Sequence, residues 1–450
     1  MSKKVSLKDG GPQSISRRKA IKTGAAAAVT AVAATSGWKP SFAKSDKTIR
    51  VWTVQNSPPQ LEAYGEIVAG FEAAYPGIKV NLEPVSSNDI WPKLAAALGG
   101  GDVPDSISQI VCPTAISLYD QGLLAPMDDV LNAIGMDDWQ ENSLDIYTGK
   151  GGEKFAACFA NNSINLWYRK DLLEDVGMDV PTTWDEHVAS AKKMTKNGMF
   201  GCSLPYGKTH MTNTIMWTFI YQAGGLVIGP DGSVVFNSPE TVAAFEFMKE
   251  MRPYCPDGAN SYSWGETLTA YVTGAAASAP YTGRAMINTN NQNPAIADHI
   301  SCAPYPYMKG GVPWWTSAFE TLTIPADCQN MEEAILWNAW CLKDEQYIRF
   351  LHAVPGHQIP VRKSIATGDA YANHPLLEKY KKEVAVMADV SSKGAPPAKP
   401  FPDFPLISKA GDIQGSGIFA EIVQRVVINN ESAKSAVAWG HDQIAKIMDY

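Results

Sequence analysis

The sequence lacks the motifs by which most enzymes are recognised. It has no Gly-x-Ser-x-Gly elbow, no His-Glu-x-x-His helix, no phosphate-binding loop and no dinucleotide-binding fingerprint, and its seven histidines have no metal-site spacing. We therefore expect a protein that is not an enzyme and that has no catalytic residue, metal or cofactor. The alternative is an exported glycosidase or lyase, because 46 acidic residues supply many candidate carboxylate pairs.

Runs of lysine or arginine are also absent, and most of the chain is acidic. Residues 1–43 contain eight of the 38 basic residues and one of the 46 acidic residues, so the remainder has a net charge of −15. An acidic surface of this kind repels polyanions. We expect no nucleic-acid partner and no general attraction to anionic lipid.

No hydrophobic run reaches the roughly 20 residues that cross a bilayer. The weakly apolar stretch Thr23–Ala34 follows the pair Arg17-Arg18 and precedes the small-x-small sequence Ser41-Phe42-Ala43. This order is typical of an export signal, and the arginine pair favours the route for folded proteins. We expect residues 1–43 to be a twin-arginine signal peptide that is removed after Ala43, which places the remaining chain in the periplasm.

Cysteine is scarce, and no Cys-x-x-Cys pair is present. An odd number of cysteines leaves at least one thiol unpaired, and sequence spacing alone does not define the pairs. We expect most of these side chains to be small buried apolar residues. The seven cysteines are Cys112, Cys158, Cys202, Cys255, Cys302, Cys328 and Cys341.

Strand and helix patterns alternate along the first part of the remaining chain. Residues 49–54, 78–82 and 106–111 are rich in β-branched residues, and residues 61–71 and 90–98 have apolar side chains at helical spacing. This alternation predicts parallel strands in a covered sheet, hence an α/β fold. A length of 450 residues with 45% apolar residues indicates a globular chain with two domains.

Later helices are predicted from their N-terminal residues. Thr183 and Glu186 form a capping box for a helix through Met194. Ser238-Pro239 supplies a cap and a first-turn proline for a helix over residues 240–251. The proline-rich stretch 391–405 predicts an extended connection.

Several segments carry a resemblance that is specific only in combination. They are Phe71–Val80, Asp102–Asp105, Leu118–Leu124, Tyr168–Leu173, Pro181–Glu186, Gly224-Gly225 and Gly274. In this order they resemble the family-one extracellular solute-binding proteins of ABC importers, of the maltose- and glycerol-phosphate-binding type. The resemblance covers most of residues 48–364, although Arg169 replaces the usual Asn and Cys158 stands where Pro is common.

This resemblance implies a two-lobed periplasmic-binding-protein fold of type II, with a ligand cleft between lobes that are joined by several hinge crossings. The expected lobes are residues 44–159 plus 304–345, and residues 160–303 plus 346–450. The implied function is to capture a sugar, oligosaccharide or glycoside and to deliver it, as a monomer, to the transmembrane subunits of an ABC permease. A uronate or glycerol phosphodiester is the anionic alternative.

Candidate ligand contacts follow from strand ends and from the resemblance. Gln55 and Asn56 come directly after the strand 49–54, and neutral amides suit sugar hydroxyls, although a plain turn explains them equally well. Arg284 fits an anionic ligand as well as a neutral one, with an ion pair across the lobes as the alternative. The residues that the resemblance implies are Gln109, Asn162, Trp217, Tyr281, Gly283, Arg284, Trp315, Glu320 and Arg362, with core packing as a nearly equal alternative for Trp217.

Overall fold

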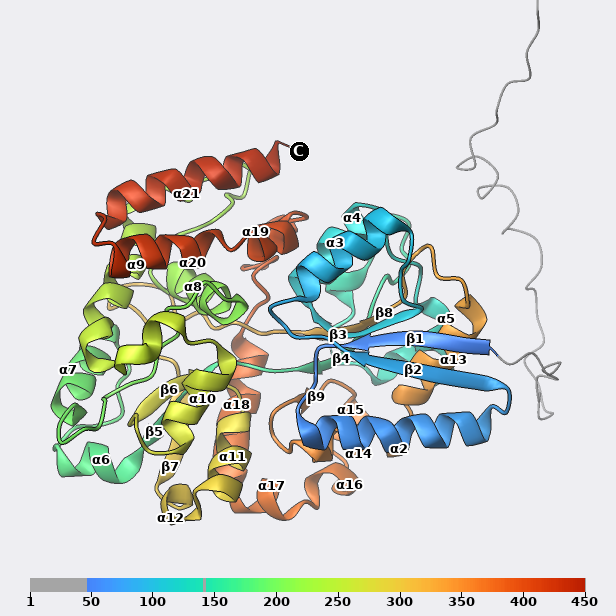
Figure 1. Cartoon of the computed structure of the whole chain (residues 1–450), viewed down its shortest axis with the longest axis horizontal. Coiled ribbons are helices and arrows are strands. Elements are labelled where there is room, and N and C mark those ends of the chain that lie inside the picture. The colour runs from blue at the N-terminus through green and yellow to red at the C-terminus, as the bar shows by residue number, and fades with distance from the viewer. Residues whose placement is uncertain (1–46, 141–142, 450) are drawn as a thin grey trace, which may run out of the picture. The chain divides into compact units, whose positions relative to one another are not determined.

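The structure is a computed structural model that describes residues 47–140 and 143–449 (Figure 1). The predicted signal peptide lies outside these residues. None of the helices described here combines the length and the apolar character that a membrane crossing requires. The described chain contains a six-stranded sheet and a three-stranded sheet.

The six-stranded sheet has the order β2-β1-β3-β8-β4-β9. Strand β1 pairs in parallel with both β2 and β3, as the alternation of strands and helices predicts, and the other pairs are antiparallel. Its strands are β1 (Lys47–Thr53), β2 (Ile78–Pro84), β3 (Ser106–Val111), β4 (Ala157–Asn161), β8 (Glu320–Thr323) and β9 (Ile359–Pro360). The three strands predicted from the sequence are therefore confirmed.

Four helices follow the first three strands, and α2 packs against the sheet through buried Tyr64, Ile67 and Phe71. They are α2 (Pro58–Ala74), α3 (Ile90–Gly100), α4 (Cys112–Asp120) and α5 (Asp128–Ile134). The helical spacing in residues 61–71 and 90–98 is confirmed by α2 and α3.

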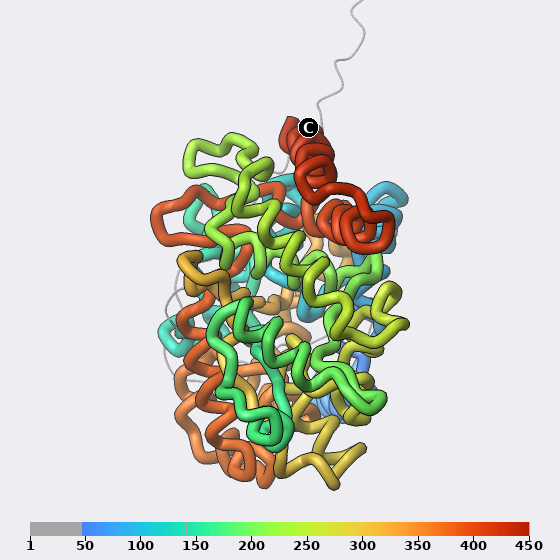
Figure 2. The backbone as a smooth tube through the Cα atoms, turned by 90° about the vertical axis from the view of Figure 1, so that its left-hand side faces the viewer, coloured from blue at the N-terminus to red at the C-terminus, as the bar shows by residue number. Residues whose placement is uncertain are grey.

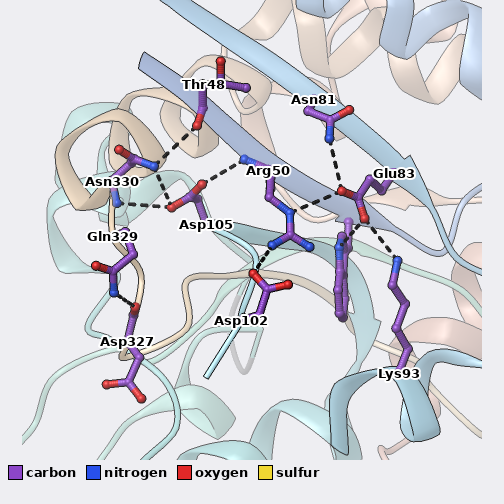
Figure 3. Close-up of polar contacts among 11 residues, drawn as sticks. Thr48, Arg50, Asn81, Glu83, Lys93, Asp102, Asp105, Asp327, Gln329 and Asn330 are labelled. Atoms are coloured by element: carbon purple, nitrogen blue, oxygen red, sulfur yellow. Dashed lines mark hydrogen bonds and ion pairs between the residues drawn. The ribbon is translucent and has the colours of Figure 1, made fainter. Parts of the chain in front are cut away.

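A carboxylate of β2 connects three elements at the edge of this sheet. Glu83 accepts hydrogen bonds from Arg50 Nε at 3.3 Å, Trp52 Nε1 at 2.9 Å and Lys93 Nζ at 3.2 Å. Figure 3 shows Glu83 with Arg50 and Lys93. Arg50 and Trp52 belong to β1, and Lys93 belongs to α3. The network therefore holds the start of α3 beside the sheet.

The three-stranded sheet is antiparallel, with the order β6-β5-β7. Its strands are β5 (Asn165–Arg169), β6 (Ser278–Tyr281) and β7 (Ile300–Pro304). Its helices are α6 (Lys170–Asp175), α7 (Trp184–Met194), α8 (His210–Gln222), α9 (Pro239–Met251), α10 (Trp264–Val272), α11 (Arg284–Gln292) and α12 (Pro294–Ala297). The Thr183–Glu186 capping box and the Ser238 cap are both present, so these two predictions are confirmed.

The remaining helices follow β8 in sequence. They are α13 (Met331–Cys341), α14 (Asp344–Ala353), α15 (Lys363–Ala366), α16 (Asp369–Ala372), α17 (Pro375–Lys379), α18 (Lys381–Lys393), α19 (Ala410–Ser416), α20 (Ile418–Val423) and α21 (Ala433–Met448). The predicted extended connection begins at Gly394, because α18 continues through Lys393.

The expected lobe boundary between residues 345 and 346 is wrong. Helix α14 lies beside α2 (Figure 1), and the rings of Phe350 and Tyr64 are 4.8 Å apart. Strand β9 pairs with β4 in the six-stranded sheet. The apolar face of α14, with Tyr347 and Phe350 buried, completes the core of that sheet. Because α15 and α16 pack on β9 and α14, the chain crosses to the other sheet after α16.

The C-terminal segment also contacts both parts of the structure, although we expected it to belong to one. Helix α19 packs on α4, where Ser117 Oγ donates a hydrogen bond to the Ser408 carbonyl at 2.7 Å. Helices α20 and α21 pack on α8 and α9, and Figure 2 shows this red segment next to the green chain. The stretch from α19 to α21 therefore contacts helices of both parts: α4 beside the six-stranded sheet, and α8 and α9 beside the three-stranded sheet.

Two glycines allow the backbone after β6 to touch the backbone before β9. A Cβ atom on Gly283 would overlap the carbonyl oxygen of Gly356, far inside van der Waals contact. Gly356 itself has a φ of +76°, which favours glycine. This close approach connects segments that belong to different sheets.

We predict that Gly283→Ala lowers the free energy of unfolding by about 2 kcal/mol or more, because the new methyl group forces the two segments apart. Gly65 is the matched control, since it lies on α2, where an added methyl group would have no atom within 4 Å. Gly65→Ala should leave the stability unchanged or raise it by up to about 1 kcal/mol. Denaturant unfolding of both variants measures this difference, and equal stabilities would contradict it.

Candidate ligand site

A cavity of about 320 Å³ lies between residues that come from both sheets. Gln55 and Glu320 reach it from the six-stranded sheet, and Tyr281 and Arg284 reach it from the three-stranded sheet. This volume is at the lower end of the range for small-molecule sites.

A buried carboxylate, Glu320 at the start of β8, organises the polar side of the cavity. It accepts hydrogen bonds from Gln55 Nε2 at 3.0 Å, from Asn162 Nδ2 at 2.8 Å and from Gln358 Nε2. Burial raises the pKa of Glu320 to about 7, although these amides and the Arg284 charge favour the ionised form. Glu320 therefore keeps its proton to a higher pH than an exposed carboxyl does.

Arg284 connects the two sides of the cavity. It is the first residue of α11, directly after β6, and its Nη2 donates to Gln55 Oε1 at 2.9 Å and to Gln60 Oε1 on α2. Burial lowers the pKa of Arg284, and its Nε is a buried donor with no partner among the described residues. Such a donor is uncommon in a folded protein, so it is a strong candidate to bind an oxygen of a ligand.

The side-chain oxygen of Gln55 determines which ring nitrogen of the buried His357 carries the proton. Gln55 Oε1 lies 3.3 Å from His357 Nε2, and it can only accept, so this nitrogen carries the proton. His357 Nδ1 then accepts from the Thr282 hydroxyl at 2.9 Å. Burial and the Arg284 charge lower the pKa of His357 well below its usual value, so this ring is neutral at pH 7.

Gln109 lies at a strained position of β3. Its φ is +66°, which is rare for a residue with a side chain, and the register between β3 and β8 shifts at this point. Its Nε2 donates to Tyr64 Oη at 2.9 Å, and its Oε1 accepts from Gln358 Nε2 at 2.6 Å. The bulge therefore places the Gln109 amide in the same network, and backbone strain of this kind clusters at functional sites.

Aromatic rings also line the cavity. Trp91 from α3, Trp264 from α10 and Tyr281 from β6 line the cavity. Trp264 and Tyr281 have ring centroids 5.6 Å apart at 84°, and the Tyr281 hydroxyl donates to the Trp264 carbonyl at 2.9 Å. Ring faces of this kind pack well against apolar C–H surfaces.

A second cavity of about 510 Å³ adjoins the first and shares Ser87, Trp91 and His210 with it. It extends to α19 and α20, where Gly415 packs directly on the Trp91 ring. The neighbouring space gives room for a ligand longer than the first cavity alone can hold.

Seven of the predicted contact residues line the first cavity. They are Gln55, Asn56, Gln109, Asn162, Tyr281, Arg284 and Glu320. These seven side chains are far apart in the sequence. They were predicted from the resemblance and from their positions after strand ends, and they lie around one cavity in the structure.

Four predicted residues are not among the lining residues, and the structure corrects them. Trp217 is fully buried in α8 against Phe419, with ring centroids 5.0 Å apart. Trp315 donates its indole N–H to the Tyr305 carbonyl at 2.9 Å. Arg362 forms ion pairs with Asp138 at 2.8 Å and Asp344 at 2.6 Å, and Gly283 serves the backbone contact described above.

Sequence reasoning missed Trp91, Trp264, His210 and His357, which also line the cavity. Trp264 is the first residue of α10 and lies within the Ser263–Glu266 capping box, and Trp91 is the second residue of a helix with clear periodicity. Each could have been proposed from its place in a first helical turn. His210 and His357 have no comparable local signal.

A profile of the bacterial extracellular solute-binding proteins matches residues 56–348, more than half of the chain. The protein belongs to this family. Members bind solutes outside the cytoplasm, so family membership implies a periplasmic or extracellular location and a role in binding. Among relatives, the putative ABC transporter periplasmic-binding protein YcjN of Escherichia coli is 19% identical over 396 residues, covering 85% of this solute-binding protein and 89% of YcjN.

Solved structures of solute-binding proteins match the whole fold. The protein of Thermotoga lettingae bound with alpha-D-tagatose has a TM-score of 0.76 at 22% identity, covering 89% of this chain and 100% of its own. A sugar transporter of Arthrobacter chlorophenolicus with bound laminaribiose has a TM-score of 0.78 at 19% identity, covering 89% and 99%. These matches confirm the predicted α/β solute-binding protein fold.

We predict that Glu320→Gln changes how stability depends on pH. The folded protein keeps a proton on Glu320 that the unfolded chain loses, so raising the pH from 4.5 to about 7 destabilises the wild type. Over this range the free energy of unfolding of the wild type should fall by about 3 kcal/mol because of Glu320. The glutamine side chain does not titrate, so the stability of the variant relative to wild type should increase over this range. Arg284 and His357 are present in both proteins.

Urea unfolding at several pH values between 4.5 and 8 measures this difference. Glu83→Gln is the control, because hydrogen bonds and ion pairs with Lys93 and Arg50 outweigh the opposing effect of burial and lower the pKa of Glu83. The contribution of Glu83 changes below pH 4.5, outside the measured window. Parallel curves for wild type and Glu320→Gln would contradict the prediction.

Proposed function

We propose that this solute-binding protein captures a neutral sugar, oligosaccharide or glycoside and delivers it to the transmembrane subunits of an ABC importer. The observation that carries the proposal is a single cavity that combines neutral amides with Trp91, Trp264 and Tyr281. Amides match hydroxyl groups, and aromatic faces match the C–H surface of a sugar ring. The solved structures with tagatose and laminaribiose support the same ligand class.

The charges of the cavity favour a neutral ligand over a uronate or a phosphodiester. Among its lining residues, Arg284 and Glu320 have opposite charges, and burial lowers the pKa of both His210 and His357. The Nη2 of Arg284 already donates to two glutamine oxygens, which weakens its ability to grip a carboxylate with two parallel hydrogen bonds. Arg362, the second cation that suggested an anionic ligand, is paired elsewhere.

Capture involves two lobes built on the two sheets, with boundaries after β4, before β8 and after α16. A ligand that contacts both sides of the cavity stabilises the closed arrangement and shifts the population toward it. The permease then recognises the closed form. The hydrogen bonds of Arg284 with Gln55 and Gln60 join the two sides of the cavity directly, and the ligand adds further contacts between them.

We also propose that residues 1–43 direct export by the twin-arginine route and are removed after Ala43. The order of an arginine pair, an apolar stretch and a small-x-small site supports this. The released protein acts as a monomer in the periplasm and requires no cofactor.

A thermal-shift screen tests the ligand class. Ribitol, tagatose, maltose and laminaribiose represent neutral ligands, and glucuronate and glycerol phosphate represent anions. A saturating neutral ligand should raise the melting temperature, because ligand at 100 times its Kd adds about 2.7 kcal/mol. Stabilisation by the anions alone would contradict the neutral assignment, and steady product formation from any binder would contradict a pure binding role.

Two tryptophan variants test the location of the site. Trp264→Ala removes a cavity wall, so we expect affinity for the best neutral ligand to fall at least tenfold. Trp315→Phe is the control, because Trp315 donates to Tyr305 outside the cavity, and its affinity should stay within threefold of wild type. Isothermal titration calorimetry measures both. An equal loss in the two variants would place the ligand elsewhere.

A further inference from the structure

Two cysteines of the three-stranded-sheet region face each other in the core. The sulfur atoms of Cys202 and Cys255 are 3.1 Å apart, and the two residues have 0% and 1% of their surface exposed. Cys202 lies in the segment after α7, and Cys255 follows the short 3₁₀ helix Arg252–Tyr254 at the end of α9. The two cysteines are therefore close in space although they come from well-separated parts of the chain.

The backbone already holds the two segments at a suitable distance. Cys202 N donates to the Tyr254 carbonyl at 3.1 Å, and Ser203 N donates to the Ser278 carbonyl of β6 at 2.8 Å. The first of these bonds holds Cys202 beside Tyr254, the residue that precedes Cys255, and disulfides join residues whose Cα atoms lie within about 7 Å of each other. A disulfide of about 2.05 Å needs only a small rotation of the two side chains.

Other cysteines have different sulfur contacts. Cys302 Sγ lies 3.5 Å from the Glu383 carbonyl, Cys328 Sγ lies 3.3 Å from Asp105 Oδ1, and Cys158 Sγ lies 3.9 Å from the Ala160 carbonyl. Each of these sulfurs faces an oxygen atom. Cys255 Sγ also lies 3.6 Å from the Met251 carbonyl, so it is the short contact between two sulfur atoms that distinguishes Cys202 and Cys255 from these three.

We propose that Cys202 and Cys255 form a disulfide bond once the protein is outside the cytoplasm, where such bonds persist. The proposal rests on the location implied by the family and not on the identity of the ligand. The two thiols lose two protons and two electrons. The electron acceptor is the disulfide of a thiol–disulfide oxidoreductase, which becomes a dithiol.

The exchange starts at Cys255. Burial opposes ionisation, but hydrogen bonds from the Cys202 thiol and the Leu204 N–H, with the nearby Arg252 charge, lower the pKa of Cys255. During local opening its thiolate attacks one sulfur of the oxidant's disulfide, which forms a mixed disulfide and releases the oxidant's other sulfur as a thiolate. The Cys202 thiolate then attacks Cys255 Sγ, and the second sulfur of the oxidant leaves as a thiolate.

The bond would close a loop that contains α8, which supplies His210 and Thr214 to the cavity wall. Closing such a loop restricts the unfolded chain and stabilises the folded one. We therefore expect a reductant to lower the melting temperature by several degrees. The bond thus secures one wall of the binding site without taking part in binding.

Thiol counting tests the proposal without any ligand. The full chain is expressed with its own N-terminal segment, recovered from outside the cytoplasm, denatured without reductant and alkylated with a maleimide. Mass spectrometry should show five alkylated thiols, because two of the seven cysteines are joined. All seven lie after residue 43, so removal of a signal peptide does not alter the count.

Single variants identify the pair. Cys202→Ala and Cys255→Ala should each show six alkylated thiols, one more than the wild type, because the remaining partner is released. Cys302→Ala is the control and should show four. Seven alkylated thiols in the wild type, or a non-reduced peptide that joins other cysteines, would overturn the proposal. Neither outcome bears on ligand binding, which is measured separately.

Discussion

The contact between Arg284 and two glutamine oxygens is the constraint around which the site is built. A guanidinium that is taken from water must find acceptors, and Gln55 and Gln60 provide them from the other side of the cavity. The remaining amide group of Gln55 then donates to Glu320, which also accepts from Asn162 and Gln358. One chain of hydrogen bonds thus runs from α11 to β8, and a buried network of this kind is stable only when its members are satisfied together.

Much of this arrangement could be predicted from the sequence where the signal is local. The strands β1 to β3 and the caps of α7 and α9 follow from periodicity and from N-terminal residues. Gln55 was found because it directly follows a strand. Gln109 and Glu320 were found through resemblance, which carries information about strand ends that lie together only in the folded protein.

The failed predictions depend on packing between distant segments. Trp217 is covered by Phe419, which returns to α8 about 200 residues later, and nothing near Trp217 in sequence indicates that cover. Arg362 pairs with Asp138 at a separation of 224 residues. The short strand β9 has only two residues and therefore no periodic pattern, so the boundary of the first lobe was placed too early.

The position of α19 has a consequence for how a solute would first meet this protein. Gly415 packs on the ring of Trp91, and Gln414 forms hydrogen bonds with His210 and Thr214 of α8. Movement of the lobes would therefore change the contacts of α19 with Trp91 or with α8. A solute that enters beside α19 would meet an indole face that accepts many ring shapes, next to the amides that recognise its hydroxyls.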